Sequence, residues 1–253
     1  MILGQSLNIL CFGDSLTAGF SFVHGLEHLH PYEVAMKATL QAAFPTYKVT
    51  TDVQGVSGDQ VLTPPGGFLT RMDICFKETH PVSPYTHAVI LGGTNDLYQQ
   101  TSPSVLFQAL KEVWAIPLEH KTTVLALTVP ECPICENVPV ERYDKLNNAI
   151  LEREKVGSGG DQFHTLDLYH IIPWVSLPEE RRKALWDDGV HFSPEGYNLM
   201  GQVIARELIK IINKENKIVE KNEEVAREQA ALEEAQRIGN FNNELKRRDH
   251  YLL

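Results

Sequence analysis

The sequence lacks the features of three large classes of protein. No stretch approaches the roughly 20 consecutive apolar residues that a membrane-spanning helix needs, so we expect no stable membrane insertion. Four cysteines in 253 residues are too few for a disulfide scaffold. Basic residues are outnumbered, 23 against 33 acidic ones, and the formal net charge of -10 has the wrong sign for holding a nucleic-acid backbone. We therefore expect a protein that folds in water and does not bind nucleic acid.

The N-terminus also lacks a visible secretion signal. Its first residues, MILGQSLNILCFGDS, contain no basic region followed by a long apolar run. Cys11 lies within an apolar run that is typical of a buried strand. Both features favour a reducing, cytoplasmic setting, although a signal peptide removed from the chain beforehand would leave the same sequence.

Apolar runs and helical patterns alternate along the chain. Hydrophobic residues make up 43% and charged residues 22% of the sequence, close to the average of globular proteins. Strand-like apolar runs occupy residues 7–12, 47–53, 88–91, 123–129 and 163–168. Helical spacing of apolar residues occupies residues 31–44, 103–118, 140–154 and 194–212. This alternation predicts an α/β fold, in which helices cover both faces of a parallel sheet.

The alternation ends near residue 214, where the composition becomes strongly charged. We expect one domain over residues 1–214 and a charged helical extension over residues 215–253. Gly239 and Asn240 are expected to end the extension's helix. One apolar residue recurs every seven positions, at Ile211, Ile218, Val225 and Leu232. This stripe indicates either a helix on its own domain or in solvent, or a helix that binds a partner or forms a homo-oligomer.

Chemistry-bearing residues follow the first predicted strand. Ser15 stands just after that strand, where ligands bind in α/β sheets. A serine in such a turn is by itself more often a helix cap, because a nucleophilic hydroxyl needs a base and a group that orients the base. His191 offers the base, and Asp188, three residues earlier, offers the orienting carboxylate, with Asp187 as its competitor. A buried histidine and a turn aspartate remain the alternatives for this pair.

Acyl transfer also needs hydrogen-bond donors for the negatively charged oxygen of its intermediate. Gly58 follows the second predicted strand, and its missing side chain lets the backbone N–H approach a substrate. Asn95 follows the third strand with a side-chain amide. Each glycine is also explained as a turn residue. In the flavodoxin-like strand order 2-1-3-4-5, however, the first three strands are neighbours, so these loops meet at one edge of the sheet.

Taken together, four short segments resemble the GDSL family of serine hydrolases, also called SGNH hydrolases, between about residues 8 and 212. They occur in the family's order, as Gly13-Asp14-Ser15-Leu16, Gly58, Gly93-Thr94-Asn95-Asp96 and Asp188-Gly189-Val190-His191. The resemblance implies a three-layer α/β/α sandwich around a five-stranded parallel sheet. It also implies hydrolysis of esters or thioesters without a metal or another cofactor.

The resemblance also implies a role for each motif residue. Ser15 becomes the nucleophile, His191 the base and later the acid, and Asp188 its orienting carboxylate. The backbone N–H groups of Ser15 and Gly58 and the side-chain amide of Asn95 become the oxyanion hole. We expect hydrolysis of small-molecule carboxylic esters with short or medium acyl chains through an acyl-enzyme. The alternatives are a carbohydrate O-deacetylase, a lysophospholipase or thioesterase, and an inactive binding module that uses the C-terminal helix.

Several nearby segments offer candidate substrate-binding residues. The candidates are Asp14, Phe20, Phe22, Ile172 and Trp174. Phe20 and Phe22 belong to the same loop as His24, His28 and His30, and we interpret this loop as facing the substrate or as a lid. Ile172 and Trp174 belong to an apolar segment that fits an acyl pocket and the core equally well. The loop at residues 64–67 is a further candidate.

Cys132 and Cys135 have the spacing of half a zinc site or of a redox pair. A structural zinc site needs four ligands, and no second pair of ligands accompanies them. We therefore expect no metal there. Their place after the fourth strand puts them near the face of the expected site, so a redox influence on activity is a minor alternative.

Overall fold

A computed structural model of the chain describes residues 6–23, 25–62, 67–157 and 160–250, and in the last helix it describes the side chains through residue 229 and at residue 233. The chain divides into two compact units, Met1–Glu207 and Leu208–Leu253. The division falls inside the last helix, α9 (Pro194–His250).

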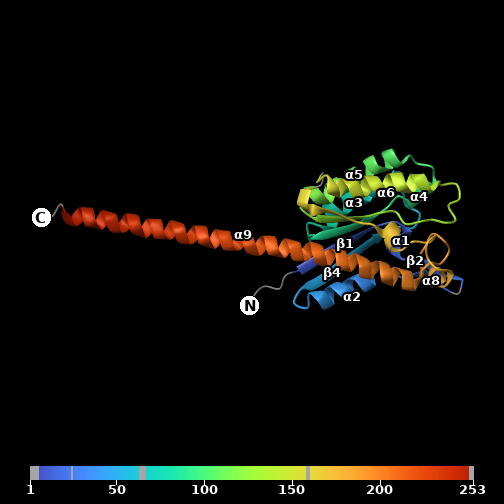
Figure 1. The fold of residues 1–253 in the computed structure, drawn as a ribbon, viewed down its shortest axis with the longest axis horizontal. Coiled ribbons are helices and arrows are strands. Elements are labelled where there is room, and N and C mark those ends of the chain that lie inside the picture. The colour runs from blue at the N-terminus through green and yellow to red at the C-terminus, as the bar shows by residue number, and fades with distance from the viewer. Residues whose placement is uncertain (1–5, 24, 63–66, 158–159, 251–253) are drawn as a thin grey trace. The chain divides into compact units, whose positions relative to one another are not determined.

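A five-stranded parallel sheet forms the centre of the first unit (Figure 1). Its strands are β1 (Ser6–Gly13), β4 (Lys48–Gly55), β5 (His87–Leu91), β6 (Thr123–Leu127) and β7 (Phe163–Leu166). They lie in the order β4-β1-β5-β6-β7, and each neighbouring pair is parallel. Counted along the chain, this is the order 2-1-3-4-5, so the predicted sheet is confirmed. Every residue of β5 and β6 is buried, as expected for strands covered on both faces.

Helices cover both faces of this sheet (Figure 1). On one face, α3 (Phe68–Ile74), α5 (Pro103–Glu119) and α6 (Val140–Lys155) pack over an apolar core that includes Leu10 and Phe12 of β1. The other face carries α2 (Glu33–Ala43) and the first turns of α9. Gly201 of α9 allows a close approach to α2, because a Cβ at this position would lie 2.2 Å from the Tyr32 carbonyl oxygen. The expected three-layer sandwich is therefore present.

Shorter elements lie between the main ones, and they were not expected from the sequence. They are α1 (Ser15–Ala18), η1 (Cys75–Thr79), α4 (Thr94–Tyr98), η2 (Gly160–Gln162), α7 (Leu168–Ile171) and α8 (Glu179–Leu185). The segment after Ser15 forms an antiparallel hairpin of β2 (Phe20–Val23) and β3 (Leu26–Leu29). The Tyr197 hydroxyl donates a hydrogen bond to the Phe20 carbonyl at 2.8 Å, which ties the hairpin to α9 near its start.

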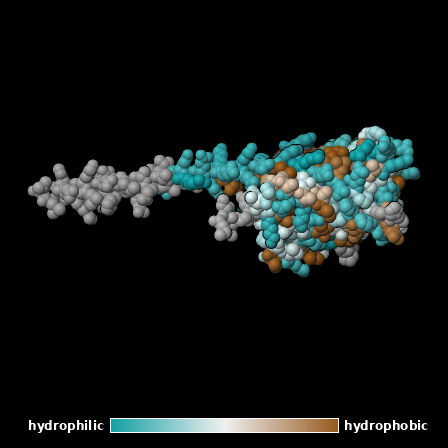
Figure 2. Space-filling model, turned by 90° about the horizontal axis from the view of Figure 1, so that it is seen from below, coloured by the Kyte–Doolittle hydropathy of each residue, from teal (hydrophilic) through white to brown (hydrophobic). Residues whose placement is uncertain are grey.

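The last helix continues past its expected end. Gly239 and Asn240 lie inside α9, so the prediction that they end the helix is wrong. A glycine in a helix costs about 1 kcal/mol relative to alanine, which the helix formers around it outweigh. Figure 2 shows the described side chains of the second unit as mostly hydrophilic. In the apolar stripe with seven-residue spacing, Ile218 and Val225 are 46% and 43% exposed. The side chain of Leu232, also in this stripe, lies outside the described part. Among the helices described, none combines the length and apolarity needed to cross a membrane.

Candidate active site

The sheet brings the predicted motif segments to one edge. Gly13, the last residue of β1, lies opposite Gly55 of β4 and Leu91 of β5, so the loops after these strands are neighbours. The first loop carries Ser15 and the other two carry Gly58 and Asn95. This arrangement follows from the strand order, because the carboxyl ends of parallel strands meet at the same edge.

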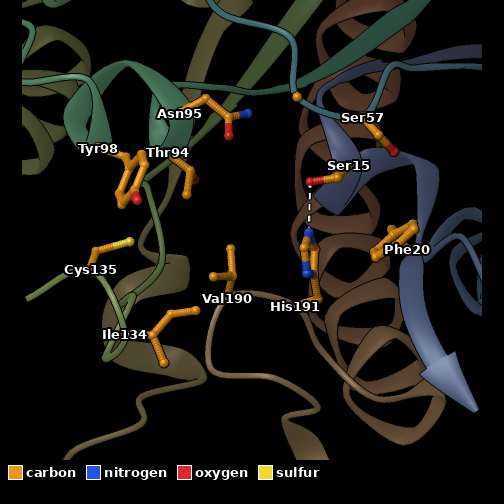
Figure 3. A pocket seen from close by; sticks show the side chains of 11 residues that line it. Ser15, Phe20, Ser57, Thr94, Asn95, Tyr98, Ile134, Cys135, Val190 and His191 are labelled. Carbon is orange, nitrogen blue, oxygen red and sulfur yellow. Dashed lines mark hydrogen bonds between the residues drawn. The ribbon is translucent and has the colours of Figure 1, made fainter. Parts of the chain in front are cut away.

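Ser15, His191 and Asp188 form one chain of hydrogen bonds. The Ser15 Oγ lies 2.9 Å from His191 Nε2 (Figure 3), and His191 Nδ1 lies 2.8 Å from Asp188 Oδ2. Because a carboxylate only accepts, Nδ1 carries the proton and Nε2 is free to accept from the serine hydroxyl. The competing Asp187 instead accepts a hydrogen bond from the backbone N–H of Phe22. Asp188 is therefore the carboxylate that faces the histidine.

The surroundings of Asp188 keep its carboxylate ionised. Its Oδ1 accepts hydrogen bonds from the backbone N–H groups of Val190 at 2.9 Å and of His191 at 2.8 Å. Partial burial raises the pKa of Asp188, but the hydrogen bonds from the His191 ring and from these two backbone groups outweigh burial and bring the pKa down to about 2. The carboxylate next to the imidazole is thus negatively charged across the neutral pH range.

Asp14 lies beneath the site and does not reach its surface. Only 1% of the residue is exposed, and its Oδ1 caps α1 by accepting from the backbone N–H of Leu16 at 2.9 Å. Burial raises the pKa of Asp14 to about 7 despite that hydrogen bond. The expectation that Asp14 binds substrate is therefore wrong, because this side chain positions the turn that carries Ser15.

A cavity of about 330 Å³ opens beside Ser15 and His191. Gly58 and Asn95 also line it, so the expected nucleophile, the base and the expected oxyanion residues border one space. Figure 3 shows Ser15, His191 and Asn95 in this lining. Gly58 has φ of +77°, and nothing lies within 4 Å of where its Cβ would be. Asn95 Nδ2 donates to the Asp59 carbonyl at 2.9 Å, and a side-chain amide has a second N–H that remains for a ligand.

Six further residues complete the cavity wall, and none was singled out from the sequence as binding substrate. They are Ser57, Thr94, Tyr98, Ile134, Cys135 and Val190. Three of them adjoin Gly58, Asn95 or His191 in the chain, and Tyr98 follows Asn95 by three residues in α4, which places both on one helical face. These four residues could have been predicted from the sequence, because they stand next to or one helical turn from the motif residues. Ile134 and Cys135 come from the loop after β6, and only their position after a strand pointed to this edge.

Of the predicted aromatic and aliphatic candidates, only Phe20 lines the cavity. Phe22 is 44% exposed and packs edge-on against Phe20, with ring centroids 5.2 Å apart, outside the lining. Ile172 is fully buried in the core. Trp174 packs against the Trp186 ring at 5.6 Å, also outside the lining. The expectations for Phe22, Ile172 and Trp174 as lining residues are therefore not met.

Two other segments with predicted roles were only partly described. His24 and the loop residues 63–66 lie outside the described part of the chain. His28 and His30 stack with ring centroids 6.2 Å apart in and beside β3. No group of three or more His, Cys, Asp or Glu that would hold a metal occurs among the described residues.

Cys132 and Cys135 are joined by a disulfide in the loop between β6 and α6. This loop packs against the segment that carries Asp188 and His191. A Cβ at Gly189, where φ is +86°, would lie 2.9 Å from Ile134 Cγ2. The disulfide loop thus forms one wall of the cavity and touches the loop of the histidine.

Three solved structures illustrate the fold to which the chain is similar. The lipase/acylhydrolase from Enterococcus faecalis is 23% identical, with a TM-score of 0.55 over 81% of this chain and 96% of that one. A putative arylesterase from Agrobacterium tumefaciens str. C58 is 20% identical, with a TM-score of 0.60 over 81% and 99%. Est24, a carbohydrate acetylesterase from Sinorhizobium meliloti, is 19% identical, with a TM-score of 0.56 over 81% and 99%. At these identities, the likeness establishes the fold alone.

The sequence also matches a family model over most of its length. None of the curated protein sequences matches the chain. The model of the GDSL-like lipase/acylhydrolase family, however, matches residues 11–199. The match includes Ser15, Gly58, Asn95, Asp188 and His191. The chain is therefore a hydrolase that belongs to the GDSL-like lipase/acylhydrolase family.

Proposed function

We propose that the protein hydrolyses carboxylic esters with short or medium acyl chains through an acyl-enzyme on Ser15. The observation that carries this proposal is the hydrogen-bonded chain from Ser15 through His191 to Asp188, which opens on a cavity next to candidate oxyanion donors. A hydroxyl, a base within reach and a carboxylate that orients the base are the parts that nucleophilic acyl transfer requires. The family match supports the same chemistry.

The geometry supports the following mechanism. His191 Nε2 takes the proton of Ser15 as Oγ attacks the acyl carbon, and the ionised Asp188 stabilises the imidazolium that forms. The negative oxygen accepts hydrogen bonds from the backbone N–H groups of Ser15 and Gly58 and from the Asn95 amide. The imidazolium then gives its proton to the leaving alcohol. Water hydrolyses the acyl-enzyme by the same transfers, with His191 again acting first as the base and then as the acid.

The composition of the cavity wall supports a neutral, compact substrate. Phe20, Tyr98, Ile134 and Val190 contribute large apolar or aromatic side chains to it. Apart from His191, none of the described residues that line the cavity has a side chain of a type that is charged at neutral pH. A phosphate-bearing headgroup or cofactor thioester would find no cationic partner there, which disfavours the lysophospholipase and thioester alternatives. The volume of about 330 Å³ favours small esters over long lipids.

Hydrolysis of a p-nitrophenyl ester series from acetate to palmitate tests this proposal. We expect the highest kcat/KM at short or medium chain length and a loss of at least about a thousandfold in Ser15→Ala. Ser104→Ala, which changes an exposed serine of α5, serves as the control and should match the wild type. Wild-type rates in Ser15→Ala would overturn the mechanism. An optimum at palmitate would favour the lipolytic alternative, and preference for acetylated sugars would favour the deacetylase.

A further inference from the structure

Arg71 of α3 binds three separate segments behind the cavity. Its Nη2 donates to the Gly13 carbonyl at 2.7 Å, its Nη1 to the Gln54 carbonyl at 2.9 Å, and its Nε to Asp59 Oδ2 at 2.7 Å. These acceptors belong to the end of β1, to β4 and to the loop after β4. The guanidinium group suits this task, because its donors form a rigid planar fork.

The guanidinium is held in place by packing as well as by hydrogen bonds. Its Cζ lies 4.4 Å from the ring centroid of Phe12 and 5.3 Å from that of Phe68. The two rings meet edge to face with centroids 5.1 Å apart. The Arg71 side chain is only 15% exposed and that of Asp59 only 10%. Both the cation and its acceptors are therefore fixed in a largely desolvated place, where such contacts are strong.

Asp59 links Arg71 to the cavity. Its carboxylate receives Arg71 Nε on one oxygen and the backbone N–H of Gln60 on the other, at 2.9 Å. The backbone carbonyl of the same residue accepts the Asn95 amide at 2.9 Å. Asp59 also directly follows Gly58 in the chain. Asp59 therefore links Arg71 to both Gly58 and Asn95.

The contact with Gly13 links Arg71 to the segment that carries a further candidate oxyanion donor, the backbone N–H of Ser15. The Gly13 carbonyl accepts from Arg71 and from the backbone N–H of Val56 at 3.2 Å, which joins the β1 end to the loop after β4. Ser15 follows Gly13 by two residues. Arg71 itself does not line the cavity. Arg71 thus contacts the segments that carry Ser15 and Gly58 directly, and it is linked to Asn95 through the Asp59 carbonyl.

We propose that Arg71 is a positioning residue that holds the backbone N–H groups of Ser15 and Gly58 and the Asn95 amide in register for the transition state. The proposal rests on the proposed function. Oxyanion donors act because they are already oriented when charge develops, and a misplacement of about 1 Å can lower the rate about a hundredfold. The loss should therefore appear in kcat, because the apolar wall that binds the ester in its ground state does not contact Arg71.

Arg71→Lys tests this proposal in the full-length protein. Lysine keeps the charge but not the planar fork, so it cannot serve Gly13, Gln54 and Asp59 together. We expect kcat to fall about tenfold or more with KM within about twofold, on the best ester of the series. Asp59→Asn is a milder variant, which keeps an oxygen for Arg71 Nε but loses the charge, and we expect a smaller loss in the same direction. Unchanged kcat in Arg71→Lys would overturn the proposal.

A double-mutant cycle separates positioning from general damage. Asn95→Ala alone should lower kcat about a hundredfold. If Arg71 acts partly through Asn95, the double variant Arg71→Lys/Asn95→Ala should lose well under the product of the two single losses, within about threefold of Asn95→Ala. A loss of kcat in the double variant that equals the product of the two single losses would mean that the two residues act independently. This result would contradict the proposal.

Arg153→Lys is the matched control. Arg153 also lies over two rings, with Cζ 5.6 Å from the Trp114 centroid and 4.6 Å from that of Phe163, but it does not line the cavity. We expect its kcat to equal that of the wild type. An equal loss in Arg153→Lys and Arg71→Lys would overturn the positioning role.

The rate at which a fluorophosphonate labels Ser15 separates this proposal from the proposed function. Labelling needs the nucleophile and the oxyanion donors but not the natural ester, and it should be about tenfold or more slower in Arg71→Lys. A wild type that is not labelled would overturn the proposed function itself. A labelled wild type with an equally fast Arg71→Lys variant would overturn only the role of Arg71.

Discussion

Two carboxylates near Ser15 have pKa values that are shifted in opposite directions. Asp188, which accepts three hydrogen bonds, has a pKa of about 2, and the buried Asp14 has a pKa of about 7. The first stabilises the positive charge that His191 acquires in the proposed mechanism. The second is largely uncharged below neutral pH, so it caps the turn of Ser15 without placing a full negative charge beneath the nucleophile. At this scale, the local environment decides the role of each acid.

Asp14 makes the stability of the fold depend on pH. Its folded-state pKa of about 7 lies above its ordinary value of 3.8, so the native state holds the proton more tightly than the unfolded state. The stabilising contribution of this proton is present below pH 3.8 and is lost as the pH rises to about 7. Relative to Asp14→Asn, the wild type should therefore lose up to about 4 kcal/mol of unfolding free energy across this range.

Urea unfolding of both proteins at pH 4, 5.5, 7 and 8 measures this difference. The amide side chain in Asp14→Asn would still offer an oxygen to the Leu16 N–H, so the cap is preserved. Parallel stability curves for the two proteins would contradict the raised pKa of Asp14. The opposite trend applies to Asp188, whose lowered pKa contributes stability that is lost as the pH falls from 3.8 toward 2.

Among the secondary-structure elements, the strands of the sheet were predictable from the sequence, and two of them, β5 and β6, are buried throughout. The five sheet strands stand out as apolar runs, and the motif segments were found because each of three follows a strand and the fourth leads into the last helix. The β2–β3 hairpin was not predictable in this way, because Leu26 and Leu29 are 73% and 62% exposed. Contacts distant in the chain fix it instead, from Tyr197 to Phe20 and from Asp187 to Phe22.

The same distinction applies to the cavity. Ser15, Gly58, Asn95 and His191 were predictable because their chemistry and spacing are local features of the sequence. The wall formed by the loop after β6 was not, because it depends on how two loops pack. Gly189 shows this dependence. Its positive φ disfavours any side chain, and Ile134 lies too close to leave room for a Cβ there.

Gly189→Ala should therefore impair catalysis as well as stability. A Cβ there would lie 2.9 Å from Ile134 Cγ2, and φ of +86° is unfavourable for alanine by roughly 1 to 2 kcal/mol. We expect lower kcat/KM, because the displaced loop carries Asp188 and His191. Gly157→Ala is the matched control, since φ there is +65° but nothing lies within 4 Å. It should lose stability at unchanged kcat/KM, and equal kinetics in both variants would refute the packing argument.

At the scale of the whole molecule, the chain consists of a catalytic unit and a charged helical unit. Every residue that lines the cavity precedes Glu207, the last residue of the first unit. The second unit exposes Ile218, Val219 and Val225 on a helix whose described residues after Asn213 are mostly charged or polar. Such a stripe is typical of a helix that meets another surface, and a second copy of the chain is the partner we hypothesise.

Removing the residues after Asn213 tests both parts of this division. If the chain self-associates through its last helix, light scattering should give an oligomer for the full chain and a monomer for the shortened one. Hydrolysis by the shortened chain should equal that of the full chain, because the cavity is complete without the removed residues. Identical monomer masses would reject self-association, and loss of hydrolysis by a folded shortened chain would reject the division of function.

The central claim is that Ser15 becomes covalently acylated, and the position of a fluorophosphonate adduct tests it most directly. Ser57 also lines the cavity, so the adduct must be assigned by peptide mass spectrometry rather than by loss of activity alone. We expect one adduct per chain, on the peptide that contains Ser15, and a much slower reaction in His191→Ala because the base is missing. An adduct on Ser57, or none on the folded wild-type protein, would contradict the account.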